Sequence, residues 1–321
     1  MTALLEAHHL TKIFGGGLVS RNKTTALQEF SMDIHTAQPN IIAVVGESGS
    51  GKTTMARLLL GIESPTAGNV LYLGKDLRKL NRGEWLQFRR DVQVVFQDPF
   101  EVYNPLYKVD HVLETPIEKF HLASSNADKQ ALIQQSLQAV GLRPEETLGR
   151  YPHELSGGQR QRVMVARALL LKPKLIIADE PVSMIDASLR ATVLDNLRKL
   201  NQDFGISIIY ITHDLTTAFQ ISQNIIVLYR GSVAEAGHVE PVVRHPQHPY
   251  TQALLAAVPI PDPSLERSRT ILESDIPSPI HPPLGCRFHN RCPSRLTDCS
   301  SSEPGLKEVV FDHHVACHLR T

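Results

Sequence analysis

VVGESGSGKTT, residues 44–54, is the stretch that decides the fold expected for this chain. It matches the pattern G-x-x-x-x-G-K-[ST], follows the β-branched apolar run 41–45 and precedes a helical pattern at 53–61. In such a strand–loop–helix unit, glycines let successive backbone N–H groups turn inward as an anion nest, and the helix N-terminus adds partial positive charge. Lys52 can reach the β- and γ-phosphates of a nucleotide, and the Thr53 hydroxyl can bind Mg²⁺. We therefore expect a phosphate site at Gly46, Glu47, Ser48, Gly49, Ser50, Gly51, Lys52, Thr53 and Thr54.

A pair of acidic residues follows a second buried apolar run. In LIIADEP, residues 175–181, Asp179 and Glu180 stand at the end of the predicted strand. Ligands of open α/β sheets bind outside the carboxyl ends of the strands, where this pair would lie. Asp179 suits a Mg²⁺ ligand, directly or through water, and Glu180 suits a general base that orients and deprotonates an attacking water. For the stretch on its own, the alternative is a solvated acidic turn.

Apolar runs typical of strands alternate with helical patterns along the chain. The strand candidates are 41–45, 92–96, 175–178, 206–211 and 225–229, and the clearest helical patterns are 129–140, 157–171 and 187–203. This alternation predicts an α/β fold with a mostly parallel sheet. Residues 98–155 have few strand signals and predict a helical insert. After about residue 231, proline and histidine become frequent, which predicts an appended, loop-rich region.

The totals exclude several classes of protein. The chain has 321 residues, 42% of them hydrophobic, and its formal net charge is zero. The length corresponds to roughly two domains, and the charge balance gives no electrostatic argument for nucleic-acid binding. No apolar run approaches the about 18 residues of a membrane-spanning helix. The opening, MTALLEAHHLTKIF, lacks the regions of a secretory signal, so we expect a soluble intracellular protein.

Between the two phosphate-site motifs lies LSGGQRQRVMVARALL, residues 155–170. It resembles the signature sequence of the ATPase subunits of ABC transporters. The pattern is physically suited to a helix start, because Ser156 can cap and the two glycines expose N–H groups toward a phosphate. The resemblance implies that Ser156, Gly157, Gly158 and Gln159 contact ATP held by the other subunit of a dimer.

Four further positions match this family one by one. Gln97 in VVFQDP resembles the glutamine that senses Mg²⁺ and the γ-phosphate and faces the membrane subunit. His213 in YITHDL resembles the histidine that stabilises the γ-phosphate during hydrolysis, and Asp186 in SMID resembles the aspartate of the family's D-loop. Phe14 stands where the family places an aromatic residue that stacks on adenine. For Phe14, a side chain in the hydrophobic core is the alternative.

The resemblance covers residues 4–235 and implies a P-loop NTPase (RecA-like) core with a helical subdomain at about 98–160. RHPQHPYTQALLAAVP, residues 244–259, resembles the C-terminal extension of oligopeptide/dipeptide importers, so 1–235 is expected to be the ATPase domain and 236–321 a regulatory extension. The loop after Phe14 and the segment from residue 98 resemble the second of the two non-identical ATPase subunits in such importers.

What the resemblance implies is ATP hydrolysis, with Mg²⁺, that powers import of peptides or a related small solute through ATP-driven dimerisation. The implied partners are a second ATPase subunit, two membrane permease subunits and, indirectly, an extracytoplasmic solute-binding protein, with the chain at the cytoplasmic face of the membrane. The alternative is a soluble ABC ATPase that is not coupled to transport. The transported substrate is selected by other subunits and is not encoded in these motifs.

All four cysteines, Cys286, Cys292, Cys299 and Cys317, lie near the end of the chain with the spacing C-x5-C-x6-C-x17-C. Structural zinc sites usually contain C-x2-4-C pairs, which this chain lacks, and an intracellular setting disfavours disulfides. Four thiolates can bind a [4Fe–4S] cluster, whose ligands often include a Cys-Pro step such as Cys292-Pro293. The tail also resembles that of importer ATPases that carry such a cluster. Zinc and unligated thiols remain the alternatives.

Overall fold

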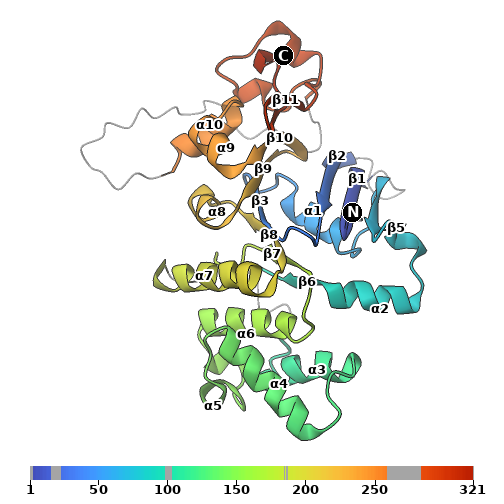
Figure 1. Ribbon diagram of the computed structural model, residues 1–321. Coiled ribbons are helices and arrows are strands. Elements are labelled where there is room, and N and C mark those ends of the chain that lie inside the picture. Colours follow the sequence, from blue (N-terminus) through green and yellow to red (C-terminus); the bar gives the residue numbers. More distant parts are fainter. Residues whose placement is uncertain are drawn as a thin grey trace. The chain divides into compact units, whose positions relative to one another are not determined.

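The computed structural model describes residues 3–15, 23–97, 103–183, 185, 187–258 and 283–320. The chain forms two compact units (Figure 1). The first comprises Met1–His35, Asn40–Lys79 and Tyr210–Thr321, and the second comprises Thr36–Pro39 and Leu80–Ile209. Within the part of the chain that is described, no helix combines the length and apolar character needed to cross a membrane.

An antiparallel sheet forms one part of the first unit. Its strands are β1 (Leu5–Gly15), β2 (Lys23–Ile34), β4 (Ala67–Tyr72) and β5 (Lys75–Asp76), in the order β2-β1-β4-β5. Apolar side chains such as Leu27 and Phe30 of β2 are fully buried, whereas their neighbours are partly exposed. This one-sided burial is typical of antiparallel sheets that face the core on one side.

A second group of strands in this unit carries the predicted phosphate loop. β3 (Ile41–Val45) lies parallel to β9 (Asn224–Tyr229), and β10 (Ser232–His238) is antiparallel to β9. Every residue of β3 is buried, as expected for a continuous apolar strand covered on both faces. The α-helices described in the unit are α1 (Lys52–Leu59), α8 (Leu215–Ile221), α9 (Val239–Arg244) and α10 (Pro249–Ala256).

The end of the chain adds two strands to this group. β11 (Lys307–Val310) and β12 (His313–Val315) form a hairpin whose second strand pairs with β10 (Figure 1, red). The sequence predicted a loop-rich region here and missed the hairpin. Strands of three or four residues are too short to show an alternating pattern, and their partner β10 lies far away in the sequence.

The second unit contains a parallel strand pair and six α-helices within its described residues. β6 (Val92–Val95) pairs in parallel with β7 (Leu175–Asp179). The helices are α2 (Arg82–Asp91), α3 (Val109–Lys119), α4 (Asn126–Ala139), α5 (Pro144–Thr147), α6 (Gly157–Leu169) and α7 (Ala187–Phe204). The fully buried β8 (Ser207–Thr212) begins in this unit and ends in the first. Parallel pairing of the buried strands confirms the predicted α/β class.

Candidate nucleotide-binding site

The loop between β3 and α1 is bent by three glycines with positive φ. Gly46, Gly49 and Gly51 have φ values of 153°, 75° and 104°. A Cβ atom at Gly46 would clash with the Leu228 carbonyl, and one at Gly51 would clash with the Ala26 carbonyl. Only glycine therefore fits these two positions, on grounds of both conformation and space.

Lys52 is folded into this loop. Its side chain is buried, and its Nζ donates to the carbonyl oxygens of Gly46 (2.7 Å) and Glu47 (2.9 Å) and lies 3.3 Å from Ser50 Oγ. The ammonium group is thereby held against the inside of the loop, which concentrates positive charge where phosphates would bind.

The N-terminus of α1 completes the phosphate side of the loop. Its N-cap residue, Gly51, is left-handed and provides no side-chain cap, and the first turn contains no acidic residue. The helix dipole and its first N–H groups therefore favour an anion. Thr53 is exposed and Thr54 half-buried on this first turn, so the Thr53 hydroxyl is accessible to a bound cation.

The acidic pair lies at the end of β7 in the second unit. Asp179 is the last residue of the strand and is 7% exposed. Glu180 follows with φ of 47°, a conformation that is strained for a residue other than glycine and that clusters at functional sites. Gln97 Nε2 donates to Glu180 Oε2 at 3.0 Å. The structure thus brings together two of the predicted catalytic residues that are 83 positions apart.

The signature segment forms a capped helix start, as predicted. Ser156 Oγ accepts from Gln159 N at 3.2 Å, and Gln159 Oε1 accepts from Ser156 N at 2.9 Å, which makes a reciprocal capping box for α6. Gly157 and Gly158 occupy the first turn. The Gln159 side chain is therefore already used in stabilising the helix end, while Ser156 remains exposed.

The remaining predicted residues differ in their exposure. His213 is exposed just after β8, in the first unit. Phe14 is 41% exposed near the end of β1, with Lys12 Nζ 4.9 Å from the centre of its ring, so it is not a core side chain. Asp186 lies outside the described residues.

Two contacts at the phosphate loop were missed by the sequence reasoning. Tyr250 at the start of α10 accepts a hydrogen bond from Glu47 N through its hydroxyl, and Arg291 forms an ion pair with the Glu47 carboxylate. The HPY triplet at 248–250 is a visible signal for the first contact. No motif marks Arg291, because its role depends on the folding of a distant segment.

The four cysteines have an environment suited to thiolate ligands. Each sulfur accepts a backbone N–H group: Cys286 from Phe288, Cys292 from Ser294, Cys299 from Leu296 and Cys317 from Leu319. Such bonds stabilise negative charge on sulfur. Burial, followed by the nearby thiols, raises the pKa of Cys286 to about 11. A bound cation would be needed to keep that thiol deprotonated at neutral pH.

The spacing of the thiols bears on which metal group fits. Among the described residues, the one group of three or more His, Cys, Asp or Glu with ligand atoms within 4.8 Å of one another is Glu6, His8 and Asp33. No three cysteine sulfurs are therefore that close, although the four interact electrostatically. Tetrahedral zinc with Zn–S bonds of about 2.3 Å requires closer sulfurs, whereas a cubane cluster separates its ligands more widely.

Known proteins match the chain along most of its length. The ABC transporter family matches residues 27–183, and the oligopeptide/dipeptide transporter C-terminal region matches residues 234–299. The oligopeptide transport ATP-binding protein OppF of Salmonella typhimurium is 45% identical over 86% of this chain and 83% of its own. The probable peptide ABC transporter ATP-binding protein y4tS of Sinorhizobium fredii is 42% identical over 99% and 90%, respectively.

A solved structure agrees with this assignment. The ATP-binding cassette MJ0796, in a dimeric post-hydrolysis state with ADP and Pi, aligns with a TM-score of 0.65 and 30% identity over 74% of this chain and 99% of its own. The P-loop NTPase core that the family resemblance implied is thereby confirmed. The chain belongs to the ATPases of the ABC transporter family, in the group that carries the oligopeptide/dipeptide transporter C-terminal region.

Proposed function

We propose that this chain powers the import of peptides, or of a related small solute, by hydrolysing ATP in a dimer that opens and closes. The observation that carries the proposal is the phosphate loop, in which buried Lys52 and the uncapped N-terminus of α1 provide a site for a polyanion. The match of residues 234–299 to the transporter C-terminal region supports import as the process that hydrolysis drives.

The residues of the first unit suit the binding of ATP and Mg²⁺. Lys52 and the N–H groups at the uncapped start of α1 would hold the phosphates, and Thr53 would offer a hydroxyl to the metal. The exposed ring of Phe14 is available for stacking on adenine. His213 would stabilise the γ-phosphate. ATP supplies the phosphoryl group that is transferred to water, with Mg²⁺ offsetting its charge.

The residues of the second unit suit the hydrolytic step. Glu180 would accept the proton of the attacking water, and Asp179 would hold Mg²⁺ directly or through water. The hydrogen bond from Gln97 fixes one Glu180 oxygen, so Gln97 can orient the base as well as contact the metal. Ser156 to Gln159, at the start of α6, would complete the ATP site of the partner subunit. Asp186, which lies outside the described residues, is proposed as a further nucleotide-binding residue.

This arrangement implies a particular assembly. We propose a second, non-identical ATPase and two permease subunits as partners, at the cytoplasmic face of the membrane, with a solute-binding protein acting indirectly and nucleic acid taking no part. In this scheme residues 1–235 form the ATPase domain and 236–321 the regulatory extension. Capture of the tagged chain from detergent-solubilised membranes, followed by mass spectrometry, tests the scheme. Two multi-span subunits and a second ATPase are expected. Recovery of ribosomal or DNA-repair proteins instead would indicate an ABC ATPase uncoupled from transport.

The four cysteines are proposed as ligands of a [4Fe–4S] cluster that stabilises the extension. The support is the backbone N–H bond to each sulfur and a thiol spacing wider than one zinc ion requires. Anaerobic purification with iron and zinc analysis tests this, together with visible absorption from thiolate-to-iron charge transfer. About four irons per chain are expected. Zinc without iron would reverse the assignment, and neither metal would indicate free thiols.

A further inference from the structure

The cysteine-containing tail contacts the phosphate loop through one side chain. Arg291, which precedes Cys292, donates from Nη1 to Glu47 Oε2 at 2.9 Å and from Nη2 to Glu47 Oε1 at 3.1 Å. Two parallel N–H···O bonds of this kind fix both the distance and the plane of the carboxylate. The Arg291 side chain is 8% exposed and the Glu47 side chain is 27% exposed, so solvent screens the pair less than it would screen a fully exposed pair.

Arg291 is held in place by the aromatic residues around it. Its guanidinium carbon lies 5.9 Å from the Tyr229 ring centre and 5.8 Å from that of Phe288, and Nη1 donates to the Tyr229 hydroxyl at 3.3 Å. Phe288 is 1% exposed and packs against both Tyr229 and Tyr250. The guanidinium is therefore oriented toward the loop by packing, and little side-chain entropy remains to be lost in forming the pair.

Glu47 is fixed at its backbone as well as at its carboxylate. Its N–H donates to the Tyr250 hydroxyl at 2.9 Å, and its carbonyl accepts from Lys52 Nζ at 2.9 Å and from Ser50 N at 3.1 Å. Displacing Glu47 would therefore disturb the bond that holds Lys52 inside the loop. The extension thus contacts the same residue from two places, Tyr250 on α10 and Arg291 in the tail.

The charge of Glu47 links its contact with Arg291 to nucleotide binding. Glu47 is the one acidic residue in the stretch 44–54, and a carboxylate beside a nest for a triphosphate repels the ligand. Arg291 offsets that charge with a guanidinium in contact with it.

We propose that Arg291 is a positioning residue for nucleotide binding, which couples docking of the cysteine-containing tail to the affinity of the phosphate loop for ATP. The inference rests on the proposed function, because it uses the same phosphate site. Coupling of this kind is reciprocal, so ATP binding should in turn stabilise the docked tail.

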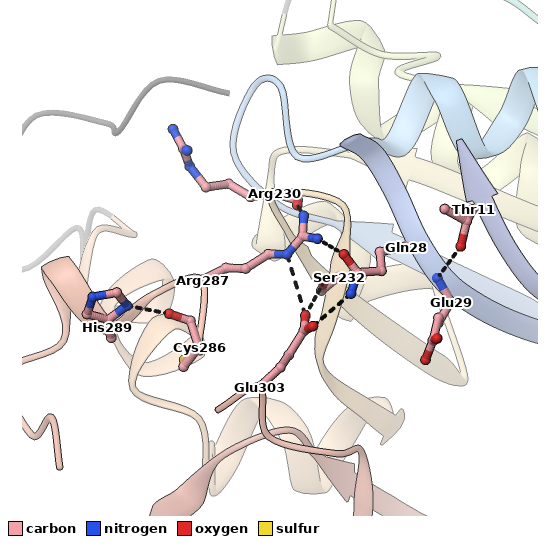
Figure 2. A network of polar contacts seen from close by, with 9 residues as sticks. All are labelled: Thr11, Gln28, Glu29, Arg230, Ser232, Cys286, Arg287, His289 and Glu303. Atoms are coloured by element: carbon pink, nitrogen blue, oxygen red, sulfur yellow. Dashed lines mark hydrogen bonds and ion pairs between the residues drawn. The ribbon is translucent and has the colours of Figure 1, made fainter. Parts of the chain in front are cut away.

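The tail also offers a matched control. Arg287 is 8% exposed and binds the Arg230 carbonyl, Gln28 and Glu303, while Gln28 Nε2 donates to Glu303 at 2.7 Å (Figure 2). Arg287→Ala therefore weakens docking of the tail without removing the charge beside Glu47. Arg291→Ala weakens docking of the tail and also removes the charge beside Glu47.

The test is equilibrium binding of mant-ATP, followed by fluorescence, to the full-length purified chain and its variants. Arg291→Ala is expected to weaken binding by about fivefold or more, Arg291→Lys by less, and Arg287→Ala by less than Arg291→Ala. Glu47→Gln in the Arg291→Ala background should restore most of the affinity, because it removes the uncompensated charge. A second readout is hydrogen exchange of residues 283–320, which ATP should slow in the wild type but not in Arg291→Ala.

The outcomes separate the inference from the proposed function. A wild-type chain that does not bind mant-ATP would overturn the proposed function. Wild-type binding with equal affinity in Arg291→Ala would overturn the coupling alone, as would equal loss in Arg287→Ala and Arg291→Ala without rescue by Glu47→Gln. If Arg291→Ala does not fold, Arg291→Lys decides: affinity equal to wild type, with ATP-dependent protection of residues 283–320 unchanged, would also overturn the coupling.

Discussion

Replacing Glu235 by alanine is expected to detach the terminal hairpin from β10. Glu235 is 0% exposed, and its carboxylate lies 2.6 Å from His313 Nε2 and accepts from the N–H groups of Gln247 (2.8 Å) and His248 (3.0 Å). One side chain thus joins β10, the turn before α10 and the hairpin strand β12.

The size of the effect follows from burial. The change leaves three donors without their acceptor, His313 Nε2 and the N–H groups of Gln247 and His248, and each donor left unsatisfied costs about 1–3 kcal/mol. These costs overlap in one cluster, so we expect the local free energy of opening to fall by about 4 kcal/mol. Glu235→Gln should cost less, because its carbonyl oxygen can still accept one of the two backbone bonds.

Hydrogen exchange of the backbone amides in residues 307–315 measures this opening. A loss of about 4 kcal/mol corresponds to exchange about a thousandfold faster, at about 1.4 kcal/mol per factor of ten. The matched control is His314→Ala, since His314 lies on the opposite face of β12 from His313 and is half-buried. Exchange less than about tenfold faster in Glu235→Ala, or equal to that of His314→Ala, would refute the reasoning.

Three further outcomes are expected. Glu180→Gln should keep mant-ATP binding but nearly abolish phosphate release, because the amide cannot take a proton from water; turnover at the wild-type rate would contradict its role as the base. Lys52→Ala should lose most of its ATP affinity in the same fluorescence titration, whereas unchanged affinity would contradict the phosphate-loop assignment. Burial lowers the pKa of His248 to about 4, below its unfolded value of about 6.5, so the unfolded state binds more protons between these values and stability falls by about 3 kcal/mol as pH drops from 6.5 to 4. Urea unfolding at stepped pH should show this loss, and His248→Asn, which keeps an acceptor for Tyr250 N, should remove it.

The sequence predicted those parts of the ATPase whose sequence signals lie within a few consecutive residues. β3, the phosphate loop and α1 are consecutive in the sequence. The apolar run, the glycine spacing and the lysine can therefore be recognised together without information from the rest of the chain. The same holds for α6, whose capping residues Ser156 and Gln159 are three positions apart. In both places, the residues that carry the chemistry also determine the local secondary structure.

The contacts that the sequence did not reveal are those between distant segments. Glu47 and Arg291 are separated by 244 positions, and Glu235 and His313 by 78. The composition of the tail, which is rich in histidine, does not single out Arg291 or His313. The exposure of Phe14 was similarly undecided, because one aromatic residue in a strand fits the core or the surface until its neighbours are known.

The composition of the tail argues that its docking depends on the cysteine site. Between residues 283 and 320, the buried apolar side chains other than cysteine are Phe288 and Val315, too few to fix a segment of this length by hydrophobic burial alone. Polar contacts at Glu47, Gln28 and Glu235 hold it instead, and each requires its partner to arrive in the correct orientation. A cluster bound by four thiolates would supply that order by joining Cys286, Cys292 and Cys299 to Cys317, two residues after the end of β12. Loss of the cluster should therefore release Arg291 from the phosphate loop, so that chelation of iron weakens ATP binding in the wild type but has little further effect in Arg291→Ala.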